Sequence, residues 1–120
     1  MLVVDYMGLM DAGEKTNSLY EKVTKISMAL HRIAQKNGLL VIALCQLNRG
    51  GTDVPRMEHL RESGQIEQDA DVIVLLHNDA EKDEYAAIVA KNKTGKCGAV
   101  PLWYDREKQH FSVIDNRRDE

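Results

Sequence analysis

A dense polar segment that runs straight into an apolar strand is the feature that most constrains the fold of this chain. Residues 61–71, RESGQIEQDAD, carry more hydrogen-bonding groups than a connecting loop requires, and residues 72–76, VIVLL, are an unbroken apolar run. Such a run, rich in β-branched residues, is typical of a strand covered on both faces, as in the parallel sheet of an α/β domain. The sequence therefore predicts polar chemistry at the mouth of a buried strand. The simpler alternative is a solvated loop with a turn of helix.

The composition favours a single soluble globular domain. The chain has 120 residues, of which 43% are hydrophobic and 29% charged, and it has no apolar run of membrane-spanning length. Cys45 and Cys97 lack the paired spacing of a metal site, which favours a reducing, cytoplasmic compartment over a disulfide framework. A formal net charge of −3 excludes a uniformly basic nucleic-acid coat but allows a narrow groove that contacts a few phosphates.

Two apolar strands near the start of the chain are each followed by a polar side chain. Residues 2–4 lead into Asp5, and residues 39–44 lead towards Gln46. Open α/β sheets bind ligands at the carboxyl ends of their strands, so Asp5 is a candidate Walker B aspartate for a hydrated Mg²⁺. A glutamine in such a place can donate to a phosphate oxygen or orient a water, so Gln46 is a candidate sensor of nucleotide state. The alternatives are an ordinary strand-end aspartate and an amide that bonds to the backbone.

A helix is predicted between these two strands. Ser18 and Glu21 have the spacing of a capping box, and Asn37 with Gly38 supplies a stop signal. Apolar residues recur at steps of four and three along one face, which predicts a core-facing stripe. The stripe consists of Leu19, Val23, Ile26, Leu30 and Ile33.

After residue 78 the pattern changes to antiparallel strands and turns. Strands are predicted at 85–90, 99–104 and 110–114. Pro101 is expected at an edge or a bulge, because it has no N–H for the ladder. Gly95-Lys96 suggests a phosphate-binding loop, but the Walker A pattern needs a glycine at position 90 and Ser or Thr at position 97, which are alanine and cysteine here. Because this segment also lies in a predicted hairpin, we reject it as a Walker A loop.

Four segments together resemble a known family. In chain order they are LVVDYMGLM, ALCQLNR, HLRESGQIEQDADVIVLL and KNKTGKCG. Their order and spacing are similar to the successive motifs of the carboxy-terminal ATPase domain of DnaB-type replicative DNA helicases, and the LRESG-x-IEQDAD run is highly specific. The resemblance implies that residues 1–120 are the part of that domain from the Walker B strand to the end. The implied fold is α/β: a partial RecA-like P-loop NTPase core, with a mainly parallel sheet and antiparallel hairpins at its C-terminal end.

The resemblance also implies a function. The family couples ATP hydrolysis to translocation on single-stranded DNA and to duplex unwinding. It acts as a ring-shaped homo-hexamer with ATP and Mg²⁺, its partners can include primase and a helicase loader, and no membrane is involved. By position, Asp5 corresponds to the Walker B aspartate that holds the metal, and Gln46 to the glutamine that couples nucleotide state to the DNA loops. Arg61, Glu62 and Gly64 correspond to the loop that touches the DNA backbone, where an arginine and a glycine N–H can both reach a phosphate without reading sequence.

Lys91 and Lys93 correspond to a Lys-x-Arg pair that the family extends towards the γ-phosphate bound by the neighbouring subunit, which implies ATP-contacting and catalytic roles. Lys93 stands where arginine is usual, and lysine lacks the planar two-donor fork. The Walker A loop and the family's catalytic glutamate have no counterpart in these residues, so we expect a fragment that alone lacks ATPase activity. The alternatives are a stand-alone DNA-binding or oligomerisation module that has lost the motor, and another RecA-like ATPase, such as a recombinase or a clock-type ATPase.

Overall fold

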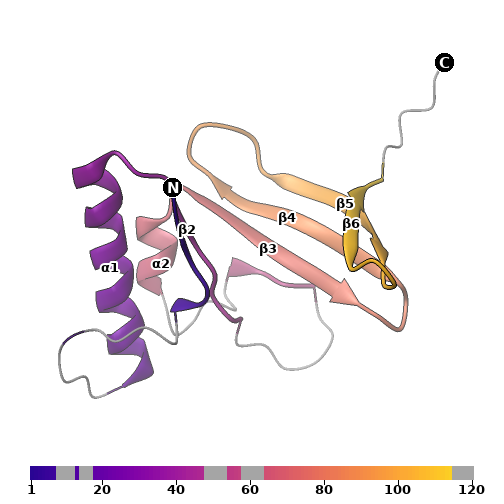
Figure 1. Cartoon of the computed structure of the whole chain (residues 1–120), viewed down its shortest axis with the longest axis horizontal. Helices are drawn as coiled ribbons and strands as arrows, with labels where there is room; N and C mark the ends of the chain where they lie inside the picture. Colours follow the sequence, from indigo (N-terminus) through magenta and orange to yellow (C-terminus); the bar gives the residue numbers. More distant parts are fainter. Residues whose placement is uncertain (8–12, 14–17, 48–53, 58–63, 115–120) are drawn as a thin grey trace. The chain divides into compact units, whose positions relative to one another are not determined.

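The structure, a computed structural model, describes residues 1–7, 13, 18–47, 54–57 and 64–114 (Figure 1). The chain divides into two compact units. The first comprises Met1–Gly50 and Met57–Ala70, and the second comprises Gly51–Arg56 and Asp71–Glu120. Within the described residues, the first unit contains the helices and a parallel pair of strands, and the second contains an antiparallel sheet.

The first unit is built on a strand–helix–strand connection. Strand β1 (Leu2–Val4) pairs in parallel with β2 (Val41–Ala43), with Leu2 opposite Val41 and Val4 opposite Ala43. Backbone bonds continue the pairing beyond the strands, because the N–H of Met7 donates to the carbonyl of Leu44 at 2.9 Å. Parallel neighbours need a crossover of a dozen or more residues, and here the crossover contains α1.

Helix α1 (Leu19–Asn37) begins and ends where its capping residues predict. The hydroxyl of Ser18 accepts a hydrogen bond from the N–H of Glu21 at 3.1 Å, which satisfies one of the free donors of the first turn. Gly38 ends the helix in the left-handed conformation, with φ +58°, and its N–H donates to the carbonyl of Ala34. Of the helices in the described part of the chain, none is long and apolar enough to cross a membrane.

The core of the first unit lies between α1 and the parallel strands. Its buried residues are Met7, Val23, Ile26 and Leu30, and Val4, Val41, Cys45 and Ile66 pack against them. The predicted stripe is therefore confirmed in its middle, whereas Ile33 is 39% exposed. A three-residue strand spans about 10 Å and a 19-residue helix about 28 Å, so β1 and β2 cannot cover the whole length of α1. The side chain of Leu19 lies outside the described residues.

The second unit is a meander of four strands in sequence order, each antiparallel to the next. The strands are β3 (Val72–Asp79), β4 (Glu84–Asn92), β5 (Gly98–Asp105) and β6 (His110–Val113). The predicted change to antiparallel hairpins is confirmed, with each strand one to three residues longer or shorter than its pattern indicated. Together the two units give the predicted α/β fold with antiparallel hairpins at its C-terminal end. Among the described strands, however, only β1 and β2 are parallel, and the four strands β3 to β6 are antiparallel.

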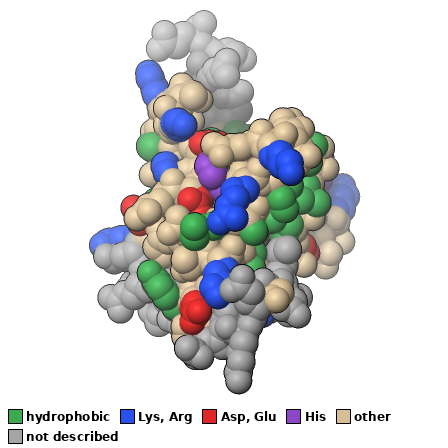
Figure 2. Space-filling model, turned by 90° about the vertical axis from the view of Figure 1, so that its left-hand side faces the viewer, with side chains coloured by type: hydrophobic (Ala, Val, Ile, Leu, Met, Phe, Trp, Pro, Cys, Tyr) green, Lys and Arg blue, Asp and Glu red, His purple; other side chains and the backbone are tan. Residues whose placement is uncertain are grey.

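Strand β3 differs from the prediction in its environment. Alternate residues Ile73 and Leu75 are only 8% and 3% exposed, whereas Val72, Val74 and Leu76 are 52%, 49% and 66% exposed. The expectation that this strand is covered on both faces is therefore wrong for this structure. An antiparallel sheet can bury one face alone, and an apolar run does not reveal what packs against its second face. Hydrophobic side chains also reach the surface on the face drawn in Figure 2, between lysine and arginine side chains.

Pro101 does not lie on an edge strand, because β5 pairs with β4 on one side and β6 on the other. Pairing with β6 begins at Leu102, opposite Val113, and the N–H of Ile114 donates to the carbonyl of Pro101 at 3.2 Å. Pro101 therefore faces β6 just past the end of that strand, where the ladder loses only one bond. The missing N–H is tolerated at the end of a pairing, as it would be at a true edge.

Candidate functional site

Asp5 and Gln46 lie at the same edge of the parallel pair. Asp5 follows β1 directly, and Gln46 comes three residues after the last residue of β2. The hydrogen bond from the N–H of Leu44 to the carbonyl of Val4, at 2.9 Å, holds the segments that follow the two strands side by side. Both side chains are exposed. The structure therefore brings together an acid and an amide at the carboxyl ends of adjacent parallel strands, where α/β sheets bind ligands.

The donor set at this edge suits Mg²⁺ better than a metal that needs a full protein cage. Among the described residues there is no cluster of three or more acidic, histidine or cysteine side chains that could hold an ion. Mg²⁺ keeps several of its waters and is bound through one or two carboxylates together with substrate phosphates. A single exposed carboxylate such as Asp5 fits that mode.

Helix α2 (Gly64–Asp69) follows the segment that contains the candidate DNA-binding residues. Gly64 is its first residue and is exposed, whereas Arg61 and Glu62 lie outside the described residues. At its other end, the carboxylate of Asp69 accepts from the hydroxyl of Ser27 on α1 at 2.9 Å and from Nε2 of Gln65 at 3.0 Å. The Ser27 bond fastens α2 to α1, and the Gln65 bond lies within α2. The packing of the two helices against each other is visible in Figure 1.

Lys91 and Lys93 lie at the end of β4 in the second unit. Lys91 is opposite Ile73, but Val89 is opposite Val74, so Ala90 is an extra residue that forms a β-bulge. Bulges change the direction in which the following side chains point, and they are common next to active sites. Lys93 comes just after the strand, where its N–H donates to the carbonyl of Asp71 at 2.9 Å and its Nζ lies 3.7 Å from Oδ1 of Asp71.

The turn after Lys93 is organised by Asn92. Its Nδ2 donates to the carbonyl of Lys96 at 3.3 Å, and its Oδ1 accepts from the N–H of Thr94 at 3.4 Å. A Cβ on Gly95 would lie 2.6 Å from Nδ2 of Asn92, so a larger residue there would force the Asn92 side chain to shift. The Gly95-Lys96 pair thus belongs to the β4–β5 hairpin, which confirms that it is no Walker A loop.

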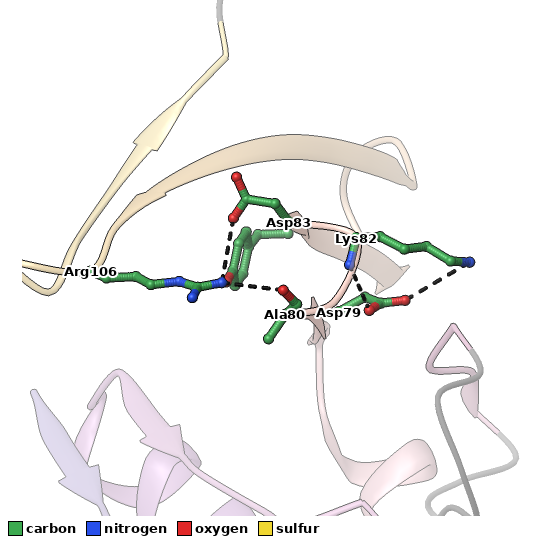
Figure 3. Close-up of polar contacts among 6 residues, drawn as sticks. Asp79, Ala80, Lys82, Asp83 and Arg106 are labelled. Carbon is green, nitrogen blue, oxygen red and sulfur yellow. Dashed lines mark hydrogen bonds and ion pairs between the residues drawn. The ribbon is translucent and has the colours of Figure 1, made fainter.

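A second polar cluster lies at the opposite end of the sheet (Figure 3). Nη2 of Arg106 donates to the carbonyl of Ala80 at 3.2 Å and to the hydroxyl of Tyr85 at 3.4 Å, and it lies 3.7 Å from Oδ1 of Asp83. The hydrogen bond to Tyr85 is the main cause that raises the pKa of Arg106. Arg106 joins the β3–β4 turn to the β5–β6 turn, which is a structural role.

The structural roles of three residues that build these sites were not predicted from the sequence. Ser27 is a short polar residue within the apolar stripe of α1, four residues after Val23, and that position was the only signal for it. Asp71 and Asn92 are recognisable only once the register of the hairpin is known, because Val72 lies opposite Asn92.

Comparison with solved structures identifies the class of fold. A solved ATPase domain superposes with a TM-score of 0.84 and 31% sequence identity, over 94% of this chain and 44% of that chain. The structure of a DnaB-like replicative helicase and its interactions with primase superposes with a TM-score of 0.83 and 34% identity, over 91% of this chain and 29% of that chain. The chain therefore has the fold of part of a RecA-like ATPase domain.

Sequence comparison identifies the family. The model of the DnaB-like helicase C terminal domain matches residues 1–113, so the chain belongs to that family. The replicative DNA helicase DnaB of Leifsonia xyli subsp. xyli is 40% identical over an alignment of 123 residues, gaps included. The alignment covers 93% of this chain and 27% of that protein. The resemblance seen in the motifs is thereby confirmed. The chain spans only about a quarter of the length of this relative.

Proposed function

We propose that this chain is part of a replicative DNA helicase, in which ATP hydrolysis drives translocation on single-stranded DNA and unwinding of the duplex. The observation that carries the proposal is the parallel β1–β2 pair, which leads to Asp5 on one strand and Gln46 on the other, in a chain matched over residues 1–113 by a helicase family. An acid and an amide at this edge are the groups that a phosphate-bound Mg²⁺ and an attacking water require.

The two residues would have different tasks. Asp5 would hold Mg²⁺ through its exposed carboxylate, directly or through a bound water. Gln46 has both a donor and an acceptor, so it would sense a phosphate oxygen through its N–H and orient a water through its carbonyl. ATP provides the phosphoryl group, and the metal neutralises the charge that develops on it.

Lys91 and Lys93 would act on the phosphate bound by a neighbouring subunit of a homo-hexamer. The bulge at Ala90 and the turn organised by Asn92 hold both residues at the end of one hairpin, which suits a group that must reach across an interface. Each lysine would bring a point charge to the transition state, without the two-donor fork of arginine.

Contacts with single-stranded DNA would come from Arg61, Glu62 and Gly64. An arginine side chain and a glycine N–H can both bind a phosphate oxygen, which gives affinity without sequence preference. Glu62 would contribute its backbone N–H or orient Arg61, because its carboxylate repels phosphate. Primase is a further proposed partner, since the similar solved helicase was studied for its interactions with primase. A helicase loader is another, and the proposed place of action is the cytoplasm.

A chimera tests this function. These 120 residues replace the similar segment of the Leifsonia xyli helicase, and unwinding of a forked DNA duplex is measured with ATP and Mg²⁺. We expect ATP-dependent unwinding that Asp5→Asn reduces by roughly 100-fold or more, which corresponds to about 2.7 kcal/mol of transition-state stabilisation. Glu81→Gln is the matched control, since it removes an equal charge from an exposed turn. A chimera that binds ATP but does not unwind, or that Asp5→Asn leaves unchanged, would contradict the proposal.

One observation favours a second candidate, an oligomerisation module. Val72, Val74 and Leu76 present an apolar surface on β3, at the edge of the four-stranded sheet. An exposed apolar edge strand is a template for pairing with another chain. Self-association of the 120 residues together with an inactive chimera would favour this candidate over the helicase.

A further inference from the structure

Lys93 has a counterion within its own hairpin. Its Nζ lies 3.7 Å from Oδ1 of Asp71, and each of the two side chains is 71% exposed. Asp71 immediately precedes β3, and Lys93 immediately follows β4, so the pair closes the open end of the β3–β4 hairpin. The charge proposed to meet a phosphate is thus held by a carboxylate in this structure.

The backbone of Lys93 is fixed independently of that carboxylate. Its N–H donates to the carbonyl oxygen of Asp71 at 2.9 Å, a bond that any residue at position 71 can accept. On its other side, Asn92 bonds to the N–H of Thr94 and the carbonyl of Lys96, which fixes the start of the turn. Removing the carboxylate of Asp71 therefore frees the ammonium group but leaves the position of the lysine backbone unchanged.

The ion pair is weak enough to be exchanged. Pairs between exposed side chains contribute little to stability, because water and salt screen them. A polyphosphate carries several negative charges and many acceptor oxygens, whereas Asp71 offers one carboxylate. A phosphate that reaches the open end of the β3–β4 hairpin can therefore displace the carboxylate of Asp71 from Lys93. The carboxylate then turns to solvent.

We propose that Asp71 is the resting counterion of Lys93, and that a phosphate group takes its place when the hairpin meets a nucleotide. This inference rests on the proposed function, since it specifies how the lysine of that function is held before use. The proposal predicts the direction of the effect on anion binding. Substitution of a residue that merely supports the site would weaken binding, whereas substitution of a competing counterion would strengthen it.

The probe is inorganic tripolyphosphate, titrated into the isotopically labelled 120-residue chain, with the amide signals of residues 91–97 followed by NMR. Asp71→Asn should lower the Kd roughly two- to five-fold, the range set by the free energy of an exposed ion pair. Asp83→Asn is the matched control, because Asp83 pairs with Arg106 at the other end of the sheet, at 3.7 Å, and its removal changes the net charge equally. That control should leave the Kd within the error of the unaltered chain.

A double substitution separates exchange from simple repulsion. In a Lys93→Gln background, Asp71→Asn should no longer tighten binding if the carboxylate acts through Lys93. Tightening that persists there, or an Asp71→Asn variant that binds no better than Asp83→Asn, would overturn the proposal. Asp71→Ala repeats the test if the asparagine variant loses the dispersed signals of the sheet. If Asp71→Asn does not tighten binding but the chimera unwinds DNA, only the counterion role of Asp71 is refuted. If Asp71→Asn tightens binding but the chimera does not unwind DNA, only the helicase function is refuted.

Discussion

The hydroxyl of Ser27 donates to the carboxylate of Asp69 at 2.9 Å, which links α1 to α2 across 42 positions of sequence. Ser27 is only 6% exposed, and the other oxygen of the carboxylate is bonded to Gln65. The link is therefore a partly buried, charge-assisted hydrogen bond that holds the short helix α2 in place.

Ser27→Ala should destabilise the first unit. The substitution removes one partner of a partly buried carboxylate, so the free energy of unfolding should fall by roughly 1–2 kcal/mol. Urea unfolding followed by circular dichroism measures the change. Ser112→Ala is the control, because the hydroxyl of Ser112 contacts only the exposed His110, at 3.3 Å, among the bonds described. A midpoint for Ser27→Ala that equals the control would mean that water replaces the hydroxyl without cost.

Gly38→Ala should also destabilise the chain, through the end of α1. Gly38 has φ +58°, a left-handed conformation that costs an alanine roughly 1–2 kcal/mol. No atom lies within 4 Å of the added Cβ, so the effect would come from the backbone alone. Gly64→Ala has equally open space and no positive φ, and its effect on the same urea midpoint should be near zero or stabilising. Equal urea midpoints for Gly38→Ala and Gly64→Ala would show that the left-handed backbone of Gly38 does not determine the effect.

Local signals in the sequence predicted the elements well, whereas they predicted burial poorly. The capping residues Ser18 and Gly38 fixed the ends of α1, because their preferences depend only on their own backbone. The apolar run of β3 was interpreted as covered on both faces, yet Leu76 is 66% exposed. Hydrophobicity reports that a strand favours burial, but the partner that buries it is a long-range property.

The candidate site shows the same division. The positions of Asp5 and Gln46 follow from the rule that ligands gather at the carboxyl ends of parallel strands, and the pairing of β1 with β2 confirms that the two lie at one edge. The pairing of Lys93 with Asp71 could not be derived from spacing, because it depends on the register of β3 with β4. A bulge at Ala90 shifts that register by one residue.

Arg61→Ala should weaken binding of single-stranded DNA equally for all sequences. A contact to phosphate releases about one counterion, so the slope of log K against log salt should decrease by about 1. Fluorescence anisotropy with the chimeric helicase, at several salt concentrations, measures the slope. Lys108→Ala removes the same charge from the exposed β5–β6 turn and should leave the slope unchanged. An unchanged slope for Arg61→Ala would remove this residue from the DNA interface.

The 120-residue chain should associate with itself through β3, and Leu76→Lys should disperse it. Val72, Val74 and Leu76 are about half or more exposed along a strand that forms one edge of the sheet, and such strands pair with other chains unless a charge prevents it. A lysine at the end of the exposed row would put a charged side chain into the apolar pairing surface of both chains, so the dissociation constant should rise about tenfold or more, which is about 1.4 kcal/mol. Light scattering over a micromolar dilution series measures the mass.

Val100→Lys is the control for this prediction. It places the same charge on β5, which is paired on both sides. If the edge strand mediates self-association, and not the open face of the sheet, Val100→Lys should dissociate the chains less than Leu76→Lys does. A monomer at every dilution of the unaltered chain would refute the prediction.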